Sequence, residues 1–140
     1  MVAYWLEAAA AKRPLRVLGD PRTVRDYVYV DDVVEVMARI HRIACASGAE
    51  SLPDVLNIGS GVPTSLMDML AAVVTTVGGV VSVEFAGGRP FDRSDVWLDV
   101  TKARRCVGWS ARTPLELGVQ RTWAHLTRQR LVNGPDGRNE

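Results

Sequence analysis

With 140 residues and a formal net charge of +1, the chain is expected to form one domain and is too weakly charged for an electrostatic nucleic-acid binder. Its hydrophobic share of 47% is ordinary for a globular protein, and a chain of this size buries about 68–70% of its unfolded surface. No apolar run approaches the ~18 residues that a membrane span needs, and the first positive charge, Lys12, follows the apolar start, the reverse of a signal peptide. The expected location is therefore the cytoplasm.

The first predicted elements are a helix over residues 3–12, which Pro14 ends, and a short strand at 15–18. The sequence "YVYV" at 27–30 alternates aromatic and β-branched residues, which predicts a second strand. This alternation of helical and strand periods continues along the chain and predicts an α/β fold.

A longer helix is predicted to follow, with Asp31 or Asp32 as its N-cap. One face of this helix carries the apolar residues expected to be buried, which are Val33, Val36, Met37, Ile40 and Ala44. A loop at 46–54, a strand at 55–58 and a helix at 65–77 are predicted next.

The second half of the chain is predicted to contain a strand at 80–85, a loop at 87–94 and a short helix at 101–107. The sequence "TPLE", which begins at Thr113, has the capping-box spacing that starts a helix. The polar, glycine-containing end of the chain predicts a disordered tail over residues 131–140.

The stretch "LNIGSGVPTSL" has the order of a dinucleotide-binding turn: an apolar run, the pair Gly59 and Gly61, and a helix start. Such a fingerprint needs a third glycine, where this chain has Thr64, and an acidic residue about 20 positions further on. Glu84 is a weak match, since it ends a predicted strand. The residues themselves favour a tight turn before a capped helix, without excluding a cofactor site.

The two cysteines, Cys45 and Cys106, each fall in a predicted helix. They are expected to be buried small hydrophobes in a reducing compartment, not a disulfide framework. His41 and His125 are expected on helix surfaces, without neighbours that suggest a catalytic triad or a metal site. The two cysteines and two histidines lie far apart and show no zinc spacing, so no metal site is expected.

A family resemblance rests on four stretches in fixed order. They resemble the C-terminal half of the extended short-chain dehydrogenase/reductases, most of all the UDP-glucose 4-epimerase-like members among the NAD-dependent nucleotide-sugar epimerases and dehydratases. The stretches are "KRPLRVLGDPRTVRDYVYVDDVVEVM", "VLNIGSGVPTSLMDML", "GGRPFDRSDVWLDVTKARRCVGW" and "TPLELGVQRTWAHL". The resemblance implies a small α/β substrate-binding domain over residues 1–130, with short strands covered by four or five helices. It also implies that "NIGSG" is structural and does not bind the cofactor.

Three site residues are implied by the resemblance. Arg25, just before the Asp26–Tyr27 pair, matches the arginine that family members direct at the diphosphate of a nucleotide-sugar, and a guanidinium fork suits phosphate oxygens. Arg89 and Asp92 match the family's R-x-G-D element, in which the arginine faces the diphosphate and the aspartate accepts a hydrogen bond from the ribose. Phe91 stands where the family usually has glycine, so a left-handed backbone there would be strained.

The catalytic half of the family carries G-x-x-G-x-x-G for NAD and a Tyr-x-x-x-Lys pair for acid–base work. None of the three tyrosines of this chain, Tyr4, Tyr27 and Tyr29, has a lysine four positions later. The chain is therefore expected to bind a UDP- or dTDP-sugar but to hold no NAD alone and to be inactive alone. A separate NAD-binding chain or a second copy would be its partner.

The alternative hypothesis is a truncated, non-enzymatic paralogue that acts as a protein-interaction module. It would use the surface that faces the NAD half in two-domain relatives. That surface is expected to include the "VLNIG" strand and the apolar face of the first helix, formed by Val2, Trp5, Leu6 and Ala9.

Overall fold

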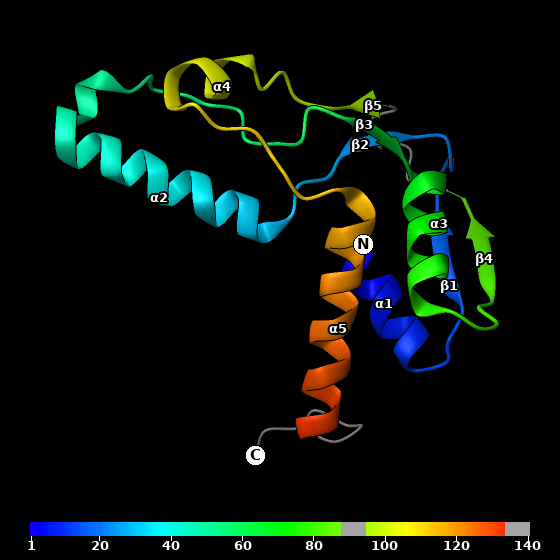
Figure 1. Ribbon diagram of the computed structural model, residues 1–140. Coiled ribbons are helices and arrows are strands. Elements are labelled where there is room, and N and C mark those ends of the chain that lie inside the picture. Colours follow the sequence, from blue (N-terminus) through cyan, green and yellow to red (C-terminus); the bar gives the residue numbers. More distant parts are fainter. Residues whose placement is uncertain (88–94, 134–140) are drawn as a thin grey trace. The chain divides into compact units, whose positions relative to one another are not determined.

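The computed structural model describes residues 1–87 and 95–133, and these residues divide into two compact units (Figure 1). The first unit draws its described residues from 1–23, 65–87 and 116–133, and the second from 24–64 and 95–115. Within the described ranges there are five α-helices and five short strands. The predicted α/β class is confirmed.

The first unit is built on a parallel pair of strands. Strand β1 (Leu15–Leu18) pairs with β4 (Val83–Ala86), with Leu15 opposite Val83 and Leu18 opposite Ala86 (Figure 1). Because parallel strands need a crossover between them, the intervening chain must leave this pair and return. The helices of this unit are α1 (Val2–Ala10), α3 (Leu66–Val77) and α5 (Leu115–Asn133), of which α5 begins at the unit boundary.

The core of the first unit lies between α1, α3 and β1. Its most deeply buried side chains, each at most 2% exposed, are Trp5, Leu6, Ala8, Leu15, Val17, Met69 and Val73. The indole Nε1 of Trp5 donates to the carbonyl of Arg16 over 2.8 Å, which satisfies the one polar group of this large side chain. The expectation that the apolar face of the first helix is exposed is therefore wrong for Trp5 and Leu6, which this unit buries within itself.

Helix α1 ends at Ala10, and a residue with left-handed backbone follows its C-cap. Lys12 has φ of 54°, its N–H donates to the carbonyl of Ala9, and the next N–H, of Arg13, reaches back to Ala8 over 2.8 Å. These two bonds form a Schellman motif, in which glycine is the usual left-handed residue. Lysine at this position adopts the left-handed conformation at an energetic cost.

The second unit holds a small sheet and a helical layer. The strand order is β3 (Pro63–Ser65), β2 (Val24–Asp26) and β5 (Asp95–Val96), with β2 and β5 parallel. The helices are α2 (Val30–Ser47), a short 3-10 turn at Ala49–Ser51, and α4 (Thr101–Val107). Helices α2 and α4 contact each other around a buried cluster of Val36, Ala103, Val107 and Trp109.

Local sequence signals predicted several elements well. Strand β1 and helix α4 have the predicted bounds, and Gly108 ends α4 with left-handed φ of 63°. Helix α3 begins where predicted because Ser65 caps it: its hydroxyl accepts the N–H of Asp68, whose carboxylate in turn accepts from Ser65.

The predicted strand at 27–30 is wrong. The strand, β2, lies immediately before it, and Tyr29 is the N-cap of α2 with extended backbone. The predicted cap is also wrong, since neither Asp31 nor Asp32 caps this helix; Asp32 is 7% exposed and accepts the backbone N–H of Thr113 over 3.0 Å. Met37, expected to be buried, is 65% exposed, because the buried face of α2 is centred on Val36.

The predicted strand at 55–58 is wrong as well. These residues form no strand, and the nearest strand is β3. Leu56 and Ile58 pack against the buried cluster of the second unit, but a strand also requires a neighbouring chain to pair with. Within the residues described, no such partner pairs with this segment.

At its end, α5 extends through Asn133 and so includes the first residues of the predicted 131–140 tail; residues 134–140 lie outside the described ranges. Among the described residues, 1–87 and 95–133, no helix is both long enough and apolar enough to cross a membrane.

Candidate functional site

Arg25 lies on β2 in the second unit, half-buried, and its Nη1 donates to the carbonyl of Val24 over 2.8 Å. The hydroxyl of Tyr27 is buried and has no hydrogen-bond partner among the described residues. Burial raises the pKa of Tyr27, and the positive charge of Arg25 partly opposes that rise.

Asp26, the next residue, is a hydrogen-bonding centre of the second unit. Its Oδ1 accepts the N–H and the hydroxyl of Ser60, both over 2.7 Å, and its Oδ2 accepts the N–H groups of Gly61 at 3.0 Å and Leu98 at 3.2 Å. Burial disfavours the charged carboxylate, but these donors outweigh burial and lower the pKa of Asp26 below its usual value. One carboxylate thus ties β2 to two segments that are distant in sequence.

The two glycines of "NIGSG" have different reasons: the Asp26 carboxylate leaves little room for a side chain at position 59, and a left-handed backbone favours glycine at position 61. A Cβ on Gly59 would lie 2.8 Å from Oδ2 of Asp26, and a Cβ on Gly61, where φ is +71°, would lie 2.9 Å from Val100. The N–H groups of Ser60 and Gly61 are already bonded to the carboxylate, so they are not free to hold a pyrophosphate. This loop therefore does not fit a dinucleotide, in keeping with the structural role that the family resemblance implied.

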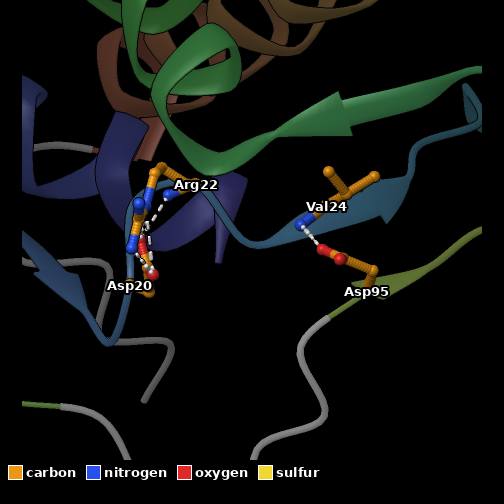
Figure 2. Close-up of polar contacts among 4 residues, drawn as sticks. All are labelled: Asp20, Arg22, Val24 and Asp95. Carbon is orange, nitrogen blue, oxygen red and sulfur yellow. Dashed lines mark hydrogen bonds and ion pairs between the residues drawn. The ribbon is translucent and has the colours of Figure 1, made fainter.

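Strand β5 brings a later segment beside Arg25. Arg25 is opposite Val96 in the parallel register, and the N–H of Val24 donates to Oδ1 of Asp95 over 2.9 Å (Figure 2). Sequence reasoning missed Asp95 because nothing local marks a side chain that bonds a strand 71 positions away.

Arg89 and Asp92 lie within residues 88–94, outside the described ranges, and so does Phe91. The predicted meeting of Arg25, Arg89 and Asp92 stays a prediction.

Arg22, a nearby arginine in sequence, belongs to the first unit. Its guanidinium pairs with the carboxylate of Asp20, with Nη2 and Oδ2 2.8 Å apart (Figure 2). Both side chains are exposed, and hydrogen bonds from Arg22 lower the pKa of Asp20. This pair closes the turn between β1 and β2.

The cysteine prediction is wrong in part. Cys45 and Cys106 do lie in helices, α2 and α4, but both are exposed. Cys45 lies nine positions after Val36 on α2, which places it on the side of that helix opposite the buried cluster. His41 and His125 are exposed, as expected.

A sequence model described as GDP-mannose 4,6 dehydratase matches residues 2–122. The chain belongs to this family. Among curated relatives, it is 35% identical over 122 residues to UDP-glucose 4-epimerase of Mycolicibacterium smegmatis, covering 87% of this chain and 37% of the relative. It is 32% identical over 131 residues to UDP-glucose 4-epimerase of Bacillus subtilis, covering 88% of this chain and 38% of the relative.

Solved structures of such epimerases match the fold of this family member. UDP-glucose 4-epimerase from Thermotoga maritima with UDP-glucose superposes with a TM-score of 0.79 at 28% identity, over 91% of this chain and 39% of the other. The Thermus thermophilus enzyme in complex with NAD gives a TM-score of 0.75 at 29% identity, over 90% and 39%. The chain therefore spans less than two-fifths of the length of these relatives, and it matches their C-terminal half.

Proposed function

We propose that this chain is the nucleotide-sugar-binding portion of an NAD-dependent sugar epimerase or dehydratase that acts in the cytoplasm, and that Arg25, Arg89 and Asp92 contact the ligand. The observation that carries the proposal is the placement of Arg25: it is half-buried on β2, directly before the Asp26 anchor, beside the strand that follows residues 89–92. Two guanidinium groups compensate the charge of a diphosphate better than one, through charge-assisted hydrogen bonds. A nucleotide-sugar with a UDP or dTDP group is the proposed ligand.

NAD would be supplied by a dinucleotide-binding domain outside these 140 residues. When bound, NAD accepts and returns a hydride during such reactions. The glycine loop of this chain is occupied by the Asp26 carboxylate, and no tyrosine has the lysine four positions later that lowers a catalytic tyrosine's pKa. The chain alone is therefore proposed to bind ligand without turnover.

The test is calorimetric titration of the full chain with UDP and with dTDP, supported by thermal shift. Ligand at 100 times its dissociation constant should stabilise the folded chain by about 2.7 kcal/mol. Arg25→Ala and Arg89→Ala should each weaken binding, whereas Arg16→Ala should not, because Arg16 is an exposed arginine on β1 that pairs with Glu84 at 3.8 Å. Equal binding by all three variants, or none by the unaltered chain, would refute the assignment.

A second candidate function, a protein-interaction module, is favoured by one surface of the second unit. Val30, Val34 and Met37 are 60%, 59% and 65% exposed and share one face of α2 at helical spacing. Val55, 68% exposed, adds to the apolar surface of this unit. Apolar side chains grouped in this way are typical of a surface that a partner covers, here a dinucleotide-binding chain or a second copy.

The two candidates differ in a measurable way. The interaction module predicts self-association, or co-elution with a separately expressed NAD-binding domain, that Val34→Asp abolishes while Glu116→Asp, a conservative change of an exposed residue on α5, leaves it intact. Light scattering that reports a clean monomer at high concentration, together with tight UDP binding, would refute the interaction module and support the ligand-binding function.

A further inference from the structure

Helix α2 brings together a histidine and a cysteine that sequence reasoning treated as unrelated. His41 and Cys45 are four positions apart, so one turn of the helix places them on the same face. The Sγ of Cys45 lies 3.6 Å from Nε2 of His41, and both side chains are exposed. The sequence-based expectation of no metal site did not consider a chelate within one helix, which needs no second pair elsewhere in the chain.

The separation of these two atoms matches that of two ligands on one zinc ion. With Zn–S of about 2.3 Å, Zn–N of about 2.0–2.1 Å and a tetrahedral angle of ~109°, the sulfur and nitrogen of a chelate lie about 3.6 Å apart. Imidazole nitrogen and thiolate sulfur are also the ligand types that zinc and cadmium prefer. We propose that His41 and Cys45 chelate a divalent cation of the zinc class on the surface of α2.

The surroundings of the pair favour a cation. Cys45 lies in the last turn of α2, where the carbonyl groups of the helix end carry partial negative charge, and this turn holds no basic side chain. The nearest basic neighbour in sequence, Arg42, directs its Nε to the carbonyl of Ala38 in the preceding turn.

Binding requires no redox step. The thiol of Cys45 releases its proton to solvent as the sulfur–metal bond forms, and neutral His41 donates the lone pair of Nε2. No group of three or more histidine, cysteine, aspartate or glutamate residues that could hold a metal occurs in residues 1–87 and 95–133. The pair thus supplies two of four tetrahedral positions, and water or groups from another molecule take the remaining two.

The chain contains a matched control. Cys106 is also exposed on a helix, α4, but the residue four positions before it is Lys102, whose ammonium donates to the carbonyl of Val55 over 3.2 Å. A protonated ammonium has no lone pair for a metal. The reactivity of Cys106 therefore serves as the control for an exposed helical cysteine that has no second metal ligand.

The test is alkylation of the full chain with iodoacetamide, with or without zinc chloride in a thiol-free reducing buffer, followed by peptide mass spectrometry of both cysteines. Because the free thiolate is the nucleophile, zinc at about ten times its dissociation constant should slow alkylation of Cys45 roughly tenfold and leave Cys106 unchanged. In His41→Ala this protection should disappear, and circular dichroism checks that the helix content is unchanged.

Magnesium chloride, which prefers oxygen ligands, should protect neither cysteine. Absence of zinc protection at Cys45, equal protection of both cysteines, or protection that survives His41→Ala would each overturn the proposal. The proposal is independent of nucleotide-sugar binding, since the test uses no nucleotide.

Discussion

The replacement Asp26→Asn removes the charge at the centre of the second unit while keeping the shape of the side chain. One carboxylate oxygen becomes an amide NH₂, which cannot accept a hydrogen bond. If the amide replaces Oδ2, the N–H groups of Gly61 and Leu98 both lose their acceptor. If it replaces Oδ1, the Ser60 hydroxyl can turn to accept, but the Ser60 N–H cannot.

The less damaging orientation sets the expected magnitude. It leaves one backbone N–H unsatisfied, which costs about 1–3 kcal/mol, and converts the other hydrogen bonds from charge-assisted to neutral. We therefore expect Asp26→Asn to lower the free energy of unfolding by about 2–4 kcal/mol. That is a large part of the roughly 5–15 kcal/mol typical of a folded domain.

Urea denaturation of both proteins, followed by far-ultraviolet circular dichroism and tryptophan fluorescence, measures this loss. Asp20→Asn is the control, because its carboxylate is exposed and pairs only with Arg22 among the described contacts, so its unfolding midpoint should stay near that of the unaltered chain. A loss below about 0.5 kcal/mol for Asp26→Asn, the range of ordinary surface changes, would refute the reasoning.

The remaining predictions concern pH, a helix end and a helix start. Because folding lowers the pKa of Asp26, the carboxylate contributes its full stabilisation at pH values above its unfolded pKa of about 3.9, and this stabilisation is lost as the pH falls through the folded pKa. The difference in free energy of unfolding between the unaltered chain and Asp26→Asn should therefore be constant near neutral pH and shrink in acid. Lys12→Gly should stabilise the chain by about 0.5–1 kcal/mol, since glycine adopts left-handed φ freely, and a lower urea midpoint would contradict the Schellman assignment. Ser65→Ala should lower the free energy of unfolding by about 1 kcal/mol by removing the N-cap of α3, whereas Ser47→Ala, at the C-terminal end of α2, should leave it nearly unchanged.

The parts of the fold that could be predicted are those decided by neighbours in sequence. The Ser65–Asp68 capping box and the glycine after α4 act within one helical turn, so their signals are complete in a short stretch. The prediction of a strand at 27–30 failed for the opposite reason. Alternation shows that a segment suits a sheet, but pairing with the distant strand β5 places the strand at β2, just before these residues.

For the candidate site, the family resemblance named Arg25 as a candidate, which stays a prediction, but sequence reasoning missed the role of the carboxylate beside it. The partners of Asp26 are 34 to 72 positions away, and no periodicity or spacing marks such a contact. The exposure of Cys45 could not be read from composition either, since burial depends on which face of α2 meets the cluster. The pair with His41, by contrast, follows from helical spacing alone.

The discontinuous make-up of the two units also constrains when the chain can fold during its synthesis. The first unit needs residues from 1–23, 65–87 and 116–133, and the cluster of the second unit needs Trp109. A chain emerging from the ribosome therefore exposes β1 and α2 long before either core can close. Folding during translation is delayed until near the last helix, and at an emergence rate of about 5–20 residues per second this leaves apolar segments open to chaperones for several seconds. Truncation before Trp109 should yield an unfolded product, not one intact unit.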